Sequence, residues 1–114
     1  MDRFFILTED GDVQILRVND LLNEIAVREI IQAAEHRIAG GFPNFVVDLS
    51  DMRFMNSIGI NFLIKLKRRS KESGGKIAVV HAPEKVKQLL DITKLRPLFF
   101  LTDSLDEAIQ YLST

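Results

Sequence analysis

The sequence has no cysteine, only three prolines, and little excess charge, with 15 lysines and arginines against 16 aspartates and glutamates. The absence of cysteine excludes disulfide bonds and thiolate metal sites, and it suits a reducing compartment. The formal net charge of −1 provides no overall field that would attract nucleic acid or an anionic membrane. The apolar run at residues 4–7 is too short for a signal peptide or a membrane span, so we expect a cytoplasmic protein.

Motifs for several kinds of chemistry are also missing. Neither G-x-x-x-x-G-K nor G-x-G-x-x-G occurs, so the common phosphate-binding loops are absent. His36 and His81 lie on different predicted elements without the spacing of metal ligands, and we interpret them as ordinary histidines. No nucleophile or base is placed beside a carboxylate. We therefore predict no enzyme activity, no catalytic residues, no metal site and no cofactor.

The length and the apolar pattern predict one domain of alternating strands and helices over residues 1–114. An opening hairpin is expected from apolar segments at 4–7 and 13–18, reversed at Asp10-Gly11. Apolar residues at helical spacing, Ile25 and Ile30 among them, predict the first helix over 21–38, with Asp20 or Asn23 as its cap. The next segment, 42–49, is almost continuously apolar, which is typical of a strand buried on both faces.

The second half repeats the strand–helix pattern. A helix over 57–73 has one apolar face, formed by Gly59, Phe62, Leu63 and Leu66. Strands follow at 76–81 and 98–101. The helix between them holds Pro83 in its first turn, and its inner stripe is formed by Val86, Leu89, Leu90 and Thr93. Ser104 and Glu107 match a capping box that opens a last helix. Strand–helix–strand units of this kind give a largely parallel sheet.

The segment 48–60 joins a buried strand to the long second helix and places Ser57 where that helix should begin. A helix N-terminus has backbone N–H groups without intrahelical partners and about half a positive charge. Ser57 is therefore either an ordinary N-cap, a role that serine often has, or a hydroxyl at which an added phosphate would be stabilised.

Residues Val46 to Ile60, VVDLSDMRFMNSIGI, resemble the signature of STAS domains, the anti-sigma-factor antagonist family. In that pattern a strand ends in Asp-Leu-Ser, and Asp-Ser-(Ser/Thr/Ala)-Gly-Leu opens a helix. Similar sequence continues at Gly74–Ile77, Val86–Leu90 and Phe99–Ala108, so the resemblance covers roughly residues 44–112. It implies an α/β fold, with a four- to five-stranded mixed sheet whose core is parallel, packed with about four helices.

The resemblance also implies a regulatory protein-binding role. In the antagonist branch the unphosphorylated protein binds an anti-sigma factor that is also a serine kinase. The kinase phosphorylates the serine of the motif, which separates the complex, and a phosphatase resets the switch. The matching serine here is Ser57. The predicted partner-binding residues surround it at the start of the helix: Asn56, Ser57, Ile58, Gly59, Ile60, Asn61 and Ile64.

Two positions depart from the family pattern. Asn56 replaces the aspartate, which keeps the capping ability but removes the negative charge, and Ile58 replaces a small residue. The alternative function is therefore a STAS scaffold that is never phosphorylated, such as a subunit of a signalling or lipid-transport assembly. Ile60 and Ile64 flank the charged helix face, and their spacing favours core positions over an exposed patch.

Two further features concern other partners. The basic run Lys65–Lys71 is interpreted as a solvated helix face, with docking to an acidic partner as the second reading. No aromatic residues interleave with it for base stacking, so nucleic acid is not predicted as a partner. The oligomeric state is left open, and a homodimer would pair through the edge strand that contains Phe4 and Phe5.

Overall fold

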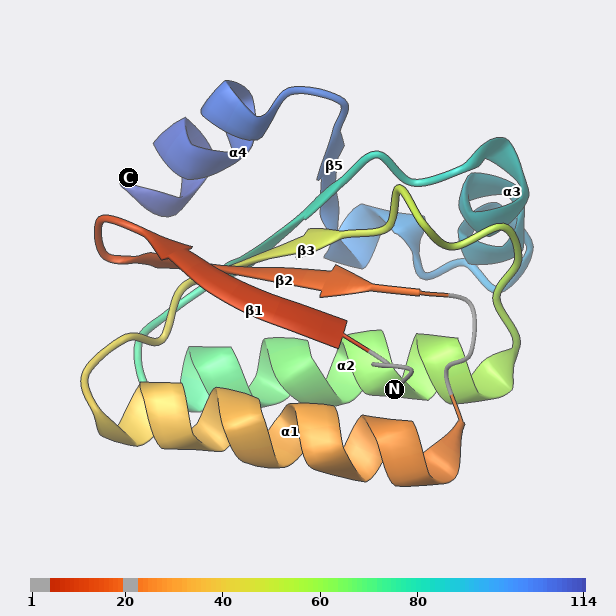
Figure 1. The fold of residues 1–114 in the computed structure, drawn as a ribbon. Coiled ribbons are helices and arrows are strands. Elements are labelled where there is room, and N and C mark those ends of the chain that lie inside the picture. Colours follow the sequence, from red (N-terminus) through yellow and green to blue (C-terminus); the bar gives the residue numbers. More distant parts are fainter. Residues whose placement is uncertain (1–4, 20–22) are drawn as a thin grey trace.

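The computed structural model describes residues 5–19 and 23–114 and shows a five-stranded sheet with helices on both faces (Figure 1). Residues Phe4 and Asp20, which enter two of the predictions above, lie outside the described residues. The elements, in chain order, are β1 (Phe5–Asp10), β2 (Val13–Val18), α1 (Glu24–Ala39), β3 (Phe45–Asp48), α2 (Ser57–Glu72), β4 (Ile77–Val80), α3 (Glu84–Ile92), the short 3-10 helix η1 (Arg96–Leu98), β5 (Phe100–Thr102) and α4 (Leu105–Leu112).

The sheet has the strand order β1-β2-β3-β4-β5, with β1 antiparallel to β2 and every other neighbouring pair parallel. The predicted mixed sheet with a parallel core is therefore confirmed. The hairpin turn is shifted from the expected Asp10-Gly11. Asp10 pairs with Val13, and Gly11, with a φ of 62°, and Asp12 make the turn. The left-handed backbone at Gly11 suits the tight turn, and it lets β1 extend through Asp10.

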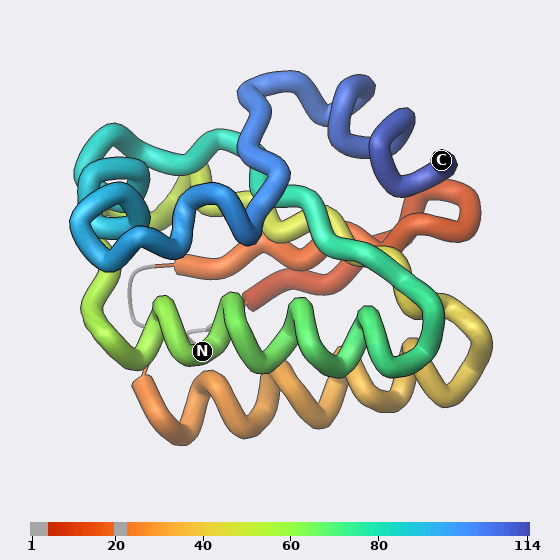
Figure 2. The backbone as a smooth tube through the Cα atoms, turned by 180° about the vertical axis from the view of Figure 1, so that it is seen from behind, coloured from red at the N-terminus to blue at the C-terminus, as the bar shows by residue number. Residues whose placement is uncertain are grey.

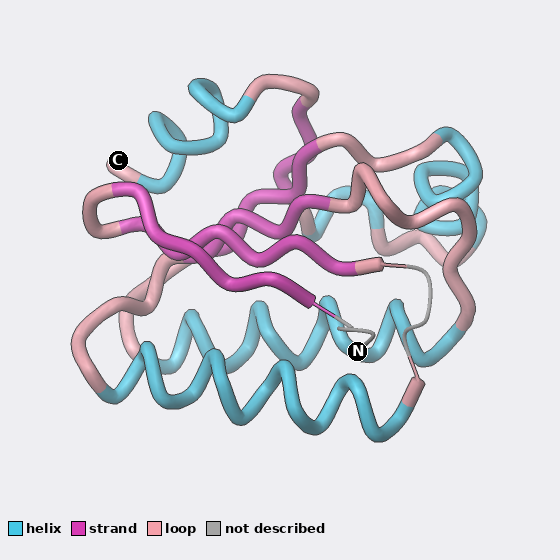
Figure 3. Tube along the Cα trace, in the orientation of Figure 1, coloured by secondary structure: helices cyan, strands magenta, loops and turns pink. Residues whose placement is uncertain are grey.

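The central strand β3 is buried on both faces, as its continuous apolar sequence predicted. Phe45 and Val47 belong to the core beneath α1, α2 and α3, whereas Val46 belongs to the core beneath α4. Because parallel crossovers place helices on the faces of a sheet, both sides of such a strand are removed from water. Figure 3 shows the sheet between its helical layers.

The first face carries α1 and α2, which lie side by side and run in the same direction (Figures 1 and 2). The apolar stripe of α2, namely Gly59, Phe62, Leu63 and Leu66, is buried as its spacing predicted. Helix α3 adds Val86 and Leu90 to the same core. On α1, Asn23 caps the helix and Ile30 is buried, but Ile25 is 63% exposed and does not join the core.

The second face carries the C-terminal helix α4, which packs on β3, β4 and β5. Ala108 and Leu112 point into the core beneath it, and the ring of Tyr111 stacks on Phe100 with centroids 4.2 Å apart. Lys76 then holds the end of the chain, because its Nζ lies 4.7 Å from the Tyr111 ring centroid and donates to the Tyr111 carbonyl at 3.2 Å.

Several predicted boundaries differ from the structure. Pro83 is the N-cap of α3 and precedes its first turn. Thr93, expected on the inner stripe of α3, is an exposed C-cap residue whose hydroxyl donates to the Leu89 carbonyl. Leu98 belongs to the 3-10 helix that contains Pro97, so the last strand starts later than expected, at Phe100.

The capping box at α4 is half formed. Ser104 Oγ accepts from the Glu107 N–H at 3.1 Å, but the Glu107 carboxylate accepts from the Thr102 hydroxyl at 2.7 Å instead of reaching back to the Ser104 N–H. That N–H instead donates to Thr102 Oγ1. None of the helices in the described residues is long and apolar enough to cross a membrane.

Candidate functional site at the start of α2

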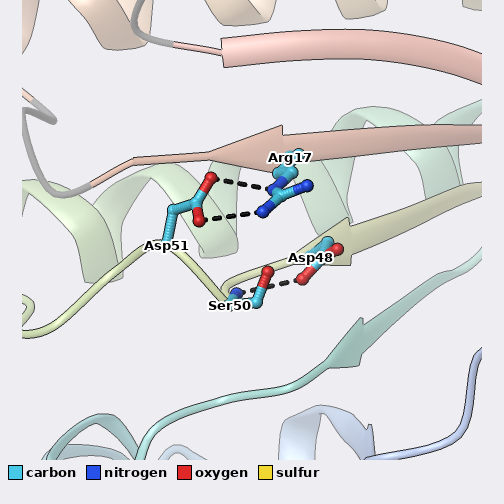
Figure 4. A network of polar contacts seen from close by, with 4 residues as sticks. All are labelled: Arg17, Asp48, Ser50 and Asp51. Atoms are coloured by element: carbon cyan, nitrogen blue, oxygen red, sulfur yellow. Dashed lines mark hydrogen bonds and ion pairs between the residues drawn. The ribbon is translucent and has the colours of Figure 1, made fainter.

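The first half of the loop between β3 and α2 is anchored to the core by two buried side chains. Leu49 and Met52 are at most 1% exposed, and the Met52 N–H donates to the Leu49 carbonyl at 2.9 Å. Asp48 Oδ1 accepts from the Ser50 N–H at 2.9 Å and closes a turn at the end of the strand (Figure 4). The Asp-Leu-Ser segment is therefore a structural element that sets the direction in which the chain leaves the sheet.

An ion pair joins this loop to the neighbouring strand. Arg17, at the end of β2, donates from Nε and Nη2 to the two carboxylate oxygens of Asp51 at 2.8 and 2.9 Å (Figure 4). The hydrogen bond and charge of Asp51, with a smaller contribution from Asp48, raise the pKa of Arg17 above its usual value. Both side chains are nearly half exposed, so the pair orients the loop more than it stabilises the fold.

The helix that follows is capped by Asn56. Its Oδ1 accepts from the Ile58 N–H at 3.0 Å and from the Gly59 N–H at 3.3 Å. Ser57 is the first residue of α2 and is exposed to solvent. The interpretation of Ser57 as the N-cap is therefore wrong, because the neighbouring amide has that role, whereas the expectation that Asn56 keeps the capping ability is confirmed.

The other predicted partner-binding residues divide into exposed and buried groups. Asn56, Ser57 and Asn61 are exposed, and Ile58 is half-buried. Gly59 and Ile60 are buried, with Ile60 8% exposed. Ile64 is 36% exposed, so the expected core position is correct for Ile60 but not for Ile64.

A groove between α1 and α2 begins beside Ser57. It has a volume of about 580 Å³. Ile58 and Asn61 from the first turns of α2 line it, which connects it to the candidate site. The α2 side continues with Lys65 and Arg69, and the α1 side is formed by Glu24, Val27, Arg28, Ile31, Gln32 and Glu35.

Two features of this surface were not found by sequence reasoning. Phe54 lies two residues before the cap and is 57% exposed. The groove depends on how α1 packs against α2, and no local pattern encodes that packing. A hint was available for Phe54, since the loop between Met52 and Asn56 contains more large apolar side chains than one anchor requires.

Comparison with known families identifies the class of protein that this fold and loop define. The sequence model of the STAS domain matches residues 5–108. The chain therefore belongs to the STAS domain family, and the resemblance noted at residues 46–60 is confirmed.

Solved structures show the same fold. A Thermotoga maritima protein assigned as an anti-sigma factor antagonist superposes with a TM-score of 0.85 at 24% identity, covering 96% of this chain and 95% of that chain. An anti-sigma factor antagonist from Mycobacterium paratuberculosis gives 0.78 at 22% identity, with 96% and 93% covered. The Bacillus cell fate determinant SpoIIAA in its phosphorylated form gives 0.73 at 18% identity, with 94% and 97% covered.

Proposed function

We propose that this chain is a cytoplasmic anti-sigma-factor antagonist, which binds an anti-sigma factor with serine kinase activity and is released when Ser57 is phosphorylated. The observation that carries the proposal is the position of Ser57, an exposed hydroxyl on the first residue of α2 in the family motif. The structural neighbours of this chain include the anti-sigma factor antagonist SpoIIAA, in its unphosphorylated and phosphorylated forms, which supports the same assignment.

The capping arrangement explains how phosphorylation can act on binding without unfolding the helix. The N–H groups of Ile58 and Gly59 are held by Asn56, so Ser57 is not needed to satisfy them. A phosphate adds about −1.5 to −2 charges at pH 7, and the positive end of the helix tolerates them. The fold of α2 therefore stays intact.

The partner surface responds differently to the same charge. A surface that fits a neutral hydroxyl would have to bury a bulky dianion without a matching cation. Such burial costs several kcal/mol, which changes affinity by orders of magnitude. Phosphorylation thus dissociates the complex, and a phosphatase that removes the phosphate restores binding. The chain itself acts as a binding module and not as an enzyme.

Kinase incubation followed by intact mass measurement tests the proposal. Serine kinases with anti-sigma activity encoded near this gene are incubated with the protein and ATP, with Ser57→Ala as the matched control. We expect one added phosphate on the wild-type chain and none on the control. If no such kinase phosphorylates Ser57, the proposal fails.

The alternative is a STAS scaffold in a signalling or lipid-transport assembly that uses the same surface without phosphorylation. Asn56 favours it, because the family aspartate and its charge are missing at this position. A stable complex with a transporter or signalling subunit that is unchanged in Ser57→Glu would support this alternative.

A further inference from the structure

The basic charge of the chain is concentrated on the second half of α2. Five of the 15 basic residues fall within positions 65–71, and none of the 16 acidic residues does, so the rest of the chain holds ten bases against 16 acids. The described residues provide no ion pair for Lys65 or Arg69. This part of the helix is thus a local positive surface on a slightly acidic protein.

The groove between α1 and α2 combines that charge with an apolar floor. Ile31 is 6% exposed, and Val27 and Ile58 are half-buried. Lys65 and Arg69 form the α2 wall without any acidic residue. A concave surface with apolar residues below and charge of one sign along one side fits an amphipathic segment.

The α1 wall defines the orientation of such a segment. It carries Arg28 but also Glu24 and Glu35, so this side does not favour a ligand that is negative all round. The carboxylates of a bound segment are favoured only along α2. Nucleic acid has phosphates along its whole length and gains affinity from stacking on aromatic side chains, and the residues that line the groove include no aromatic.

We propose that this groove binds an amphipathic segment of a protein partner, with leucine-like side chains on Val27 and Ile58 and carboxylates facing Lys65 and Arg69. The inference rests on the proposed function in one respect, because the segment belongs to the protein that contacts Ser57. The connection is direct, since Ile58 and Asn61 follow Ser57 on α2 and also line the groove. The groove then supplies the part of the affinity that does not depend on the hydroxyl.

A titration with a defined peptide tests the groove without the kinase. The probe is a fluorescein-labelled helical peptide with leucines on one face and glutamates along one flank. Isotope-labelled protein is titrated with it, and the amide shifts are mapped by NMR. We expect saturable shifts at Val27, Ile31, Ile58 and Lys65. A peptide with glutamine in place of glutamate should bind more weakly.

Charge reversal supplies the matched control. Lys65→Glu should weaken peptide binding about tenfold, whereas Lys85→Glu, which makes the same charge change on an exposed position of α3, should leave it unchanged. Equal affinities for the two variants would overturn the inference. So would shifts elsewhere on the protein, no saturable shifts, or stronger binding of a single-stranded DNA oligonucleotide or of phosphatidylserine vesicles at the same residues.

The failure of the groove inference and the failure of the proposed function give different results. If the peptide binds but no kinase phosphorylates Ser57, the groove inference stands and the antagonist function fails. If a kinase phosphorylates Ser57 but the peptide leaves the groove residues unshifted, the antagonist function stands and the groove inference fails.

Discussion

The cap at the start of α2 gives a prediction whose size follows from two hydrogen bonds. Asn56→Ala removes the side-chain acceptor of the Ile58 and Gly59 N–H groups, which lie at 3.0 and 3.3 Å. Loss of an N-cap costs about 1 kcal/mol of unfolding free energy, which lowers Tm by about 4 °C in a protein of this size. The helix itself should remain, because Phe62, Leu63 and Leu66 keep it anchored in the core.

Asn56→Asp, which restores the family residue, should have the opposite effect. It retains an oxygen acceptor and adds a negative charge at the positive end of α2, worth about 0.5 kcal/mol. A carboxylate stabilised in this way has a folded-state pKa below its unfolded value of about 3.9. The gain is therefore fully present above that value, is lost as the pH falls through the folded-state value, and also shrinks in high salt.

Urea unfolding followed by far-UV circular dichroism measures both variants. Asn61→Ala is the control, because Asn61 is exposed on the same helix and does not cap it, and it should change stability by less than about 0.5 kcal/mol. If Asn56→Ala proved as stable as Asn61→Ala, or if Asn56→Asp lost stability at pH 7, the capping argument would be refuted.

Two more substitutions separate surface from core. Phe54→Ala should leave the unfolding free energy nearly unchanged but weaken partner binding about tenfold in an affinity titration. Phe62→Ala should instead lower the unfolding free energy by about 3–5 kcal/mol in urea unfolding. Equal stability losses in the two variants would contradict this division. Gly75→Ala should cost about 2 kcal/mol or more, because a Cβ there would lie 2.2 Å from the Pro43 carbonyl oxygen. In Gly74→Ala the added Cβ has no atom within 4 Å, so only the left-handed backbone lowers the unfolding free energy, by about 1 kcal/mol. A larger loss of stability in Gly74→Ala than in Gly75→Ala would contradict the close-packing argument.

The hydrophobic pattern of the sequence predicted which residues of β3 and α2 are buried. The continuous apolar run of β3 predicted a strand covered on both sides, and the stripe of α2 predicted its buried face. Both patterns arise because each residue's environment repeats with the period of its own element. Which helices cover which face of the sheet was not predictable, since it depends on where α4 returns to the sheet.

The misjudged residues lie where an element ends. Ile25 and Thr93 fit a helical stripe, yet Ile25 lies in the first turn of α1 and Thr93 is the C-cap of α3, where the core no longer covers the stripe. Asp10 was placed in the turn because Asp-Gly is a strong turn pair. The two turn residues are instead Gly11 and Asp12, so the left-handed glycine takes the first turn position and not the second.

The candidate site was predicted in position but not in its division of roles. The sequence predicted Ser57 at the N-terminus of α2, and in the structure Asn56 is the N-cap residue and Ser57 the first helical residue. Capping by either residue was compatible with the sequence, because both side chains are good caps and a shift of one residue in the helix start exchanges their roles. The groove beside Ser57 required the packing of α1 against α2, which joins residues more than twenty positions apart.

The affinity of the phosphorylated and unphosphorylated chain for the same anti-sigma kinase tests the central claim most directly. Both forms are prepared, the phosphate on Ser57 is verified by intact mass, and binding is measured by titration calorimetry without ATP. We predict that the phosphorylated form binds at least about a hundredfold more weakly while its far-UV circular dichroism is unchanged. Equal or tighter binding by the phosphorylated form, or by Ser57→Glu, would contradict the account.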